Sequence, residues 1–403
     1  MKQKKGALFL VIIIMMTVIG LISTDIYLPS LPQIATDFHS SQDNAQFTIS
    51  LFLLGLSISQ LIYGPLSEKF GRKPIVLIGI SIFVVASLAC LISNSIEMLI
   101  VSRLFQGIGA CSGMTIGRSI IGDAFSKKEA AKIFATVFLF VGFSPAIAPV
   151  IGGYIDSYFG WRIVFANVLL FGIVLLILIS MFLPETLDKN KKSSIHPYNI
   201  FKNYISLVIN KTFIGYAIIP CIAYVAYFAY LTSSPFILSN NGYRGEIIGA
   251  CYISLSISYV MGNFTSRKLL NSYELNKVLS IGYLIFVSSG IAMLLLNHYS
   301  FNLFLFLLPI TCLTFANGFL IPLGSAGVIT NFPYLSGYAS GLLGFLQLGS
   351  AAVSSAIVGK LTNGSYTALS YYLSITTVIG ILLFYGLIVF RNHGAIKLNI
   401  PIA

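Results

Sequence analysis

Apolar runs of about 20 residues recur along almost the whole chain and are separated by short polar links. A helix of about that length crosses roughly 30 Å of hydrocarbon, so each run is long enough to span a membrane. The opening run has no cleavage-site pattern after it and is predicted to be a retained span, not a signal peptide. The predicted spans, about twelve in all, lie near residues 8–30, 47–66, 75–93, 98–121, 132–155, 163–183, 212–234, 247–266, 277–296, 302–328, 337–359 and 367–390.

One long polar segment, from Pro184 to Lys211, interrupts this pattern in the middle of the chain. It leaves six runs on each side, which is typical of transporters built from two related halves. The sequence predicts an all-α integral membrane protein with two six-helix, pseudo-symmetric halves. The predicted boundaries are 1–190 for the N-terminal bundle, 191–211 for a cytoplasmic central loop and 212–403 for the C-terminal bundle.

The composition agrees with a membrane protein. Of the 403 residues, 57% are hydrophobic and only 9% are charged, which is far more apolar surface than one soluble core buries. The formal net charge of +12 does not indicate a nucleic-acid partner, because the basic residues lie in short links between apolar runs. The expected surroundings are a lipid bilayer.

The basic residues also indicate which side of the membrane each link faces. Most of the 24 Lys and Arg residues lie near the two termini, in the central segment and in the links after the second, fourth and eighth runs. Arg162, Arg244 and Lys360 lie in links on the opposite side. Because positively charged links tend to stay in the cytoplasm, both termini are predicted to be cytoplasmic.

Several classes of function lack the residues that they need. The five cysteines form no CxxC pair and the four histidines lie in links or at a terminus, so no disulfide framework and no metal site is expected. An ATP-driven pump would need a G-x-x-x-x-G-K-[ST] loop, which the sequence does not contain. Repeated filter-like loops and a catalytic carboxylate pair or nucleophile are also missing, which argues against an ion channel and against a membrane enzyme.

Four short motifs follow one another through the first five runs: STDIYLPSLPQIATDF, GPLSEKFGRKP, RLFQGIGA and GFSPAIAPVIGG. The second and third resemble signatures of the major facilitator superfamily, the last resembles the motif of its drug:proton antiporters, and the first resembles its bicyclomycin-resistance branch. The resemblance implies a monomeric transporter in the bacterial cytoplasmic (inner) membrane that works by alternating access. It also implies a proton gradient as the energy source and no bound cofactor.

The segment GPLSEKFGRKP is unusually rich in charge for this chain. Gly64 has no side chain to hold a neighbouring helix away, and Gly71 can adopt the positive φ that a sharp turn needs. Glu68, Arg72 and Lys73 are predicted to form a charged cluster at the cytoplasmic surface. The superfamily pattern usually has Asp where this chain has Glu68.

Asp123, at the cytoplasmic end of the fourth run, is the predicted partner of Arg72. Their ion pair would hold the inner face shut in one conformation and break in the other. The alternative is that this link is only a positively charged anchor. The embedded Glu68 and the paired glycines favour a cytoplasmic gate.

The fifth run combines Pro145 and Pro149 with Gly142, Gly152 and Gly153. The prolines leave consecutive turns short of backbone hydrogen bonds and the glycines give the helix a smooth face, so a bent, closely packed helix is predicted. The resemblance to antiporters implies that this helix lies between the two halves and influences leakage and the direction of exchange. The alternative is a kinked helix with a packing role only.

Asp25, Arg103 and Arg118 are the ionisable residues that lie clearly inside apolar runs, where charges are costly and usually functional. Asp25 and Arg103 are predicted to meet at one depth, so that movement of Arg103 loads and releases a proton on Asp25; the alternative is a structural ion pair. Gln106, one turn from Arg103, is expected to bind either the substrate or that pair. Arg118, about 22 Å beyond Arg103, is expected to lie at the inner end or to join Asp123.

Aromatic residues in the seventh run are candidates for binding the substrate. Tyr224 and Tyr227 lie one helical turn apart and offer both ring area and hydroxyl groups, as a weakly specific amphipathic pocket requires. The alternative is an aromatic belt at the membrane interface. No acidic residue lies deep in the last six runs, so neutral or zwitterionic compounds are favoured over strictly cationic ones.

Together these features predict a proton-coupled secondary transporter that exports small amphipathic compounds such as antibiotics. The partners expected are the small-molecule substrate, protons and the lipid bilayer, with no nucleic acid. The alternative is the same fold importing a nutrient or osmolyte, or moving a siderophore or metabolite.

Overall fold

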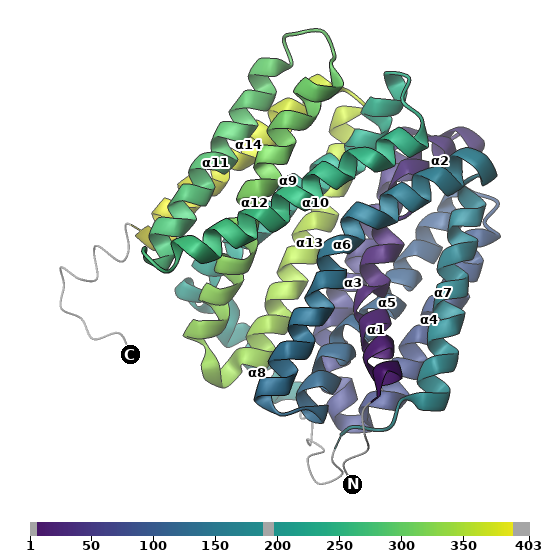
Figure 1. Ribbon diagram of the computed structural model, residues 1–403, viewed down its shortest axis with the longest axis vertical. Coiled ribbons are helices and arrows are strands. Elements are labelled where there is room, and N and C mark those ends of the chain that lie inside the picture. Colours follow the sequence, from purple (N-terminus) through teal and green to yellow (C-terminus); the bar gives the residue numbers. More distant parts are fainter. Residues whose placement is uncertain (1–5, 188–196, 390–403) are drawn as a thin grey trace. The chain divides into compact units, whose positions relative to one another are not determined.

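The computed structural model describes residues 6–187 and 197–389, which form helices joined by short links (Figure 1). In the described part, 12 helical segments are long and apolar enough to cross a membrane, which confirms the predicted number of spans. The N-terminal helices are α1 (Ala7–Asp25), α2 (Leu31–Asp37), α3 (Gln42–Phe70), α4 (Arg72–Leu91), α5 (Ile96–Ala124), α6 (Lys127–Phe159) and α7 (Trp161–Phe182). The C-terminal helices are α8 (Pro197–Ile209), α9 (Lys211–Asn240), α10 (Gly245–Leu269), α11 (Leu275–Leu296), α12 (Leu303–Asn331), α13 (Ser336–Thr362) and α14 (Tyr366–Phe384).

Two stretches differ from the predicted pattern. The first span continues past residue 30 to Asp37, because a short 3-10 helix, η1 (Leu28–Ser30), and α2 follow α1. Each of them has a proline in its first turn, where the missing N–H of proline costs nothing. The described part of the predicted central loop is not irregular but forms α8 and the start of α9, whereas residues 188–196 lie outside the described residues.

The chain groups into two compact units. Unit 1 contains the described N-terminal residues together with Leu231–Ser256 and Ser355–Gly364, and unit 2 contains Pro197–Tyr230, Ile257–Ser354 and the residues after Ser365. Segments of α9, α10 and α13 therefore pack with the N-terminal helices in this conformation. The predicted division into bundles 1–190 and 212–403 stays a prediction.

Within unit 1, α5 packs against both α3 and α4, and α1 lies against α5 on one side and α6 on the other. The α3–α5 contact is close because Gly107 faces the Phe52 carbonyl oxygen, at a place where no side chain fits. Within unit 2, α11 packs against α12 and α14. Close packing through small residues is how helices associate in lipid, where the hydrophobic effect gives no driving force.

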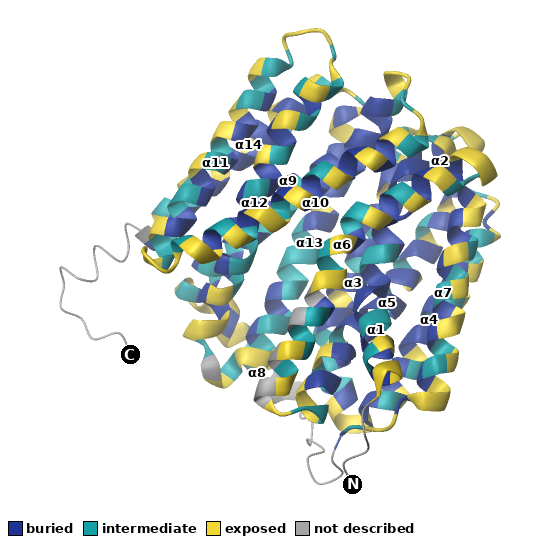
Figure 2. Ribbon diagram, in the orientation of Figure 1, coloured by how far each residue is buried: buried dark blue, intermediate teal, exposed yellow. Residues whose placement is uncertain are grey.

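Large apolar side chains are exposed along the spanning helices, as Figure 2 shows by residue. Val85 of α4, Leu284 of α11 and Leu382 of α14 are examples that are each more than half exposed. Exposed apolar surface of this extent is unfavourable in water but is the normal surface of a helix in hydrocarbon.

Candidate transport site

Arg103 lies in α5 and is fully buried. Its guanidinium stacks on two aromatic rings, with Cζ 4.4 Å from the ring centroid of Tyr27 and 4.0 Å from that of Phe52. Nη1 donates to the Ser23 carbonyl oxygen at 3.0 Å, while Nε and Nη2 have no hydrogen-bond partner among the described residues. Cation–π contact therefore takes the place of a counter-ion for much of this group.

Gln106 supports Arg103. Its Oε1 accepts a hydrogen bond from Arg103 Nη1, and its Nε2 donates to Ser87 Oγ of α4 at 2.8 Å. The side chain is fully buried, so both ends of the amide are used inside the protein in this conformation. Of the two roles predicted for Gln106, this geometry favours support of the arginine over direct contact with a substrate.

Asp25 is the last residue of α1 and only 5% exposed. Its carboxyl group faces the Ser144 hydroxyl of α6 and interacts electrostatically with Tyr252 of α10, but Oδ2 has no hydrogen-bond partner in the described part of the chain. Since the ring of Tyr252 comes from the C-terminal half of the sequence, Asp25 lies where α1, α6 and α10 come together in unit 1.

Asp25 and Arg103 are not paired in this conformation, and their predicted meeting in another conformation stays a prediction. No salt bridge joins them within residues 6–187. Arg103 of α5 reaches the Ser23 carbonyl oxygen of α1, whereas Asp25 of α1 faces Ser144 of α6. The carboxylate and the guanidinium are thus both buried and not paired with each other.

The proline- and glycine-rich part of α6 packs closely, as predicted. Pro145 and Pro149 lie inside the helix. Gly152 faces the Ile26 carbonyl oxygen and Gly153 faces the Gly245 carbonyl oxygen, both so closely that a side chain would collide with backbone. Gly142 has nothing within 4 Å of its Cβ position, so the expected smooth face is used only near the C-terminal end of α6.

The charged link between α3 and α4 contains the expected turn and the expected ion pair. Gly71 joins the helices with φ +107°, a conformation that favours glycine. Arg72 Nε donates to Asp123 Oδ2 at 2.8 Å, and Arg72 Nη1 donates to the Ser67 hydroxyl at 2.7 Å. Arg72 is nearly buried, so the pair is partly shielded from solvent.

The carboxylate expected in this cluster comes from a different residue. Glu68 is exposed and forms no salt bridge in the described part, whereas Glu185, just after α7, accepts hydrogen bonds from the backbone N–H groups of Arg72 at 3.0 Å and Lys73 at 3.1 Å. A carboxylate at the first N–H groups of α4 satisfies donors that the helix leaves free and complements its dipole. Lys73 Nζ donates to a carbonyl oxygen of α7, that of Ser180, at 2.9 Å.

The close helix contact expected at Gly64 is also not formed. Nothing lies within 4 Å of its Cβ position, because this face of the last turns of α3 borders open space in this conformation. Gly71, in the same link, is required both for space and for its backbone conformation. A side chain there would meet the Glu185 carboxylate and would strain the backbone.

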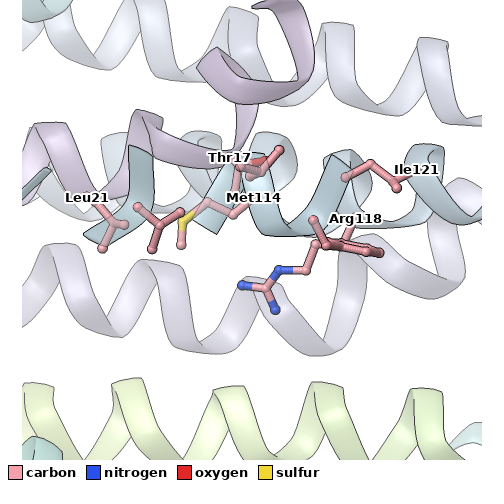
Figure 3. A pocket seen from close by; sticks show the side chains of 8 residues that line it. Thr17, Leu21, Met114, Arg118 and Ile121 are labelled. Atoms are coloured by element: carbon pink, nitrogen blue, oxygen red, sulfur yellow. The ribbon is translucent and has the colours of Figure 1, made fainter. Parts of the chain in front are cut away.

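Arg118 lines a cavity of about 40 Å³ between α1, α5 and α6 (Figure 3). The other lining residues are Thr17, Leu21, Met114, Ile121, Phe134, Val137 and Val141. Figure 3 shows the guanidinium extending away from α5, with the apolar lining beside it. Asp123, the other position considered for Arg118, forms a salt bridge with Arg72.

In unit 2, the two predicted substrate-binding tyrosines belong to one aromatic group on α9. The rings of Tyr224 and Phe228 are stacked at a centroid distance of 5.8 Å, and Tyr227 meets the Phe228 ring edge-on at 5.7 Å. Both tyrosines are half-buried, whereas Tyr230 is fully buried against Phe306 of α12. Tyr224 and Tyr227 are therefore accessible to a ligand, and Tyr230 is part of the core.

A family model for the Major Facilitator Superfamily matches residues 13–355, which is most of the chain. The chain belongs to the major facilitator superfamily. The match includes both motifs that resemble superfamily signatures. Arg72 belongs to GPLSEKFGRKP and Arg103 to RLFQGIGA, and both lie in the N-terminal half of the sequence. Membership of this superfamily implies a transporter.

Curated relatives of this superfamily match nearly the full length of the chain. The chain is 24% identical over 387 residues to a bicyclomycin resistance protein homolog of Haemophilus influenzae, covering 96% of this chain and 97% of that protein. It is 24% identical over 365 residues to multidrug resistance protein D of Escherichia coli, covering 88% and 89%. It is 27% identical over 365 residues to multidrug resistance protein MdtL of Shewanella oneidensis, covering 89% and 90%.

Solved structures of the superfamily share the fold. The crystal structure of a D-xylose–proton symporter superposes with a TM-score of 0.73 at 13% identity, covering 93% of this chain and 96% of that chain. A POT family transporter in complex with a thioalcohol-conjugated peptide gives a TM-score of 0.76 at 12% identity, covering 95% and 96%. At such identities, the likeness shows the helix arrangement alone.

Two polar residues of this superfamily member were missed by sequence reasoning. Glu185 follows the sixth apolar run, on the side predicted to be cytoplasmic. The charged link between α3 and α4 is predicted to lie on the same side, so the sequence already allowed the observed contact between Glu185 and Arg72. Asp156 lies near the end of the fifth run and resembles a link residue, yet it is 8% exposed. Gly245 of α10 lies close to its carboxyl group, a contact that the local sequence does not show.

Proposed function

We propose that this protein exports small amphipathic compounds, including antibiotics, in exchange for protons, by alternating access. The observation that carries the proposal is the match, over most of the chain, to relatives named for bicyclomycin or multidrug resistance. The half-buried rings of Tyr224 and Tyr227, which pack against the buried Phe228, support it, because exposed ring area with hydroxyl groups suits amphipathic ligands.

Proton coupling is proposed to use Asp25 and Arg103. In this conformation the two groups are buried and separate, so a neutral Asp25 avoids the cost of a buried unpaired anion. In the alternate conformation Arg103 approaches Asp25, the guanidinium becomes the counter-ion of the carboxylate, and the proton leaves to water. The movement of this pair thereby couples transport to the proton gradient, with no cofactor and no ATP.

The close contacts of α6 with Ile26 and Gly245 support alternating access. They close the end of unit 1 that lies away from the N-terminus, because they join the C-terminal ends of α1 and α6 to the start of α10. From the positive-inside pattern we infer that this end faces outward, in the bacterial inner membrane, with both termini in the cytoplasm. We further propose that one chain acts as a monomer.

Flux measurements test the proposed function. Everted membrane vesicles that contain the protein are offered a panel of antibiotics and metabolites, with the proton gradient imposed or collapsed. Export predicts gradient-dependent accumulation of at least one antibiotic inside everted vesicles, and vesicles without the protein serve as the control. Accumulation of a nutrient only in right-side-out vesicles would support the import alternative instead, and no gradient-dependent flux in either orientation would reject proton coupling.

A further inference from the structure

Asp156 of α6 is a second buried carboxylate that the proposed proton pathway does not use. It lies inside the membrane span Lys132–Phe159, it is 8% exposed, and its Oδ1 has no hydrogen-bond partner in the described part of the chain. Buried polar atoms normally have a partner, so an orphaned carboxylate oxygen in a span requires an explanation.

The surroundings of Asp156 form the closest contact between α6 and α10. Gly249 of α10 faces the Pro149 carbonyl oxygen, and Gly153 faces the Gly245 carbonyl oxygen, in both cases too closely for a side chain. One turn further along α6, a Cβ at Gly245 would lie 3.4 Å from Asp156 Oδ2. The first turn of α10 thus packs directly over the carboxyl group.

A hydroxyl group and another acid act on Asp156, and no salt bridge in the described part of the chain pairs it with a cation. The Ser30 hydroxyl of η1 faces the carboxyl group, and the Asp37 carboxylate of α2 acts on it electrostatically. On α10, Glu246 accepts a hydrogen bond from Ser157 and is influenced by Arg244. No salt bridge reaches Asp156 from the elements that pack around it in the described part.

An ionised carboxylate buried without a counter-charge is strongly disfavoured, whereas a neutral carboxylic acid is tolerated and can donate a hydrogen bond. When α6 and α10 separate, water reaches the group and the charged form becomes favourable. Closure of the contact and protonation of Asp156 are therefore linked. A proton acts like any ligand and shifts the equilibrium toward the conformation that binds it better, which here is the closed one.

We propose that Asp156 is a second proton-linked residue, which is ionised while the α6–α10 contact is open and takes up a proton from water as the contact closes. Its place in the transport cycle rests on the proposed function: Asp25 couples exchange to the gradient, and Asp156 makes closure of this end depend on the pH of the adjoining solution. Opening hydrates the carboxylic acid, which returns its proton to water.

Cross-linking measures closure without a substrate. Gln42 of α3 and Asn240 of α9 both reach the Cβ position of Gly364, at 2.6 and 2.7 Å, so cysteines in their places report closure at this end and leave Asp156 untouched. A short bifunctional thiol reagent is applied to the Gln42→Cys/Asn240→Cys protein in lipid nanodiscs from about pH 5 to about pH 8.5, the range over which buried carboxylates titrate. Single-cysteine variants correct for the native Cys312, which is exposed.

Cross-linking is expected to decrease as the pH rises in the parent protein and to stay high at every pH in Asp156→Asn, which mimics the protonated group. Asp156→Glu should restore the dependence, and the matched control Glu246→Gln, at the same contact, should keep it. All variants are also tested with Asp25→Asn, so that titration of Asp25 does not contribute.

A parent protein without pH dependence, or an Asp156→Asn profile that matches the parent, would overturn the proposal. If Asp156→Asn does not fold, Asp156→Ala provides a second neutral residue with the same expected loss of pH dependence. Because the assay uses neither a substrate nor a gradient, its result is independent of the flux panel. Failure of antibiotic export and failure of the Asp156 proposal are therefore distinguishable.

Discussion

Replacing Arg72 should slow transport without weakening substrate binding. Its side chain is 7% exposed, and its Nε donates to Asp123 Oδ2 at 2.8 Å. Arg72 Nη1 also donates to the Ser67 hydroxyl at 2.7 Å. Arg72→Ala removes both hydrogen bonds and leaves Asp123 without its partner. Arg72→Lys keeps the charge, but its ammonium group cannot reproduce the fixed, planar arrangement of two donor nitrogens that the guanidinium offers.

The size of the effect follows from this geometry. A hydrogen bond to a charged group contributes about 1.5–3 kcal/mol. The Asp123 side chain is 26% exposed, so solvent screening reduces the contribution; we take about 1–2 kcal/mol. If the pair belongs to one conformation only, its loss shifts the conformational equilibrium about 5- to 30-fold. Turnover of Arg72→Ala at saturating substrate should decrease by a similar factor, and that of Arg72→Lys by less.

The assay compares turnover in proteoliposomes with the dissociation constant of the same antibiotic, measured on purified protein. Lys69→Ala is the matched control, because it removes one positive charge from the same link and Lys69 is not in a salt bridge of the described residues. Parent-like turnover of a well-expressed Arg72→Ala protein would refute the gate. Equal slowing by Lys69→Ala would show that the link is only a charged anchor.

Three further substitutions test other parts of the structure. Gly153→Ala places a methyl group against the Gly245 carbonyl oxygen and should abolish transport. The control Gly142→Ala should remain active, because its methyl group meets nothing within 4 Å. Equal activity of the two variants would reject the tight contact. Tyr227→Ala should raise the dissociation constants of some panel compounds about tenfold and leave those of others unchanged, since ring area and not one hydrogen bond gives the affinity. If every compound binds as tightly as to the parent protein, Tyr227 does not belong to the binding pocket. Gln46→Leu removes two buried amide atoms that have no hydrogen-bond partner among the described residues. It should raise the free energy of unfolding by about 1 kcal/mol, measured as a higher thermal midpoint. A lower midpoint would show that the amide is hydrogen-bonded in the membrane.

The spans could be predicted because their signal is local. Hydrocarbon imposes a minimum length and excludes charge, and both constraints are visible in each apolar run. The continuation of the first span through α2 was missed, because Pro29 and Pro32 read as the end of a helix although each begins a new one. Helix α8 was missed because its polar, lysine-containing surroundings resemble a loop.

The candidate site could be predicted only where charge and depth decide the contact. Arg72 and Asp123 were expected to pair, and do, because both lie at the same end of neighbouring spans. For Asp25 and Arg103, which are not paired in this conformation, depth alone does not give the direction in which a side chain points around its helix. Asp156 was beyond sequence reasoning, because residues far from it in the sequence, such as Ser30 and Gly245, lie close to its carboxyl group.

The central claim is that Asp25 carries the proton that drives transport. The most direct measurement uses purified Asp25→Asn protein in liposomes with an imposed pH gradient and an antibiotic substrate. Asparagine keeps the shape of the side chain but binds no proton, so the variant should still bind and exchange the antibiotic between the two sides. It should not concentrate the antibiotic against its gradient. Uphill, pH-gradient-dependent transport by Asp25→Asn at the parent rate would contradict the account.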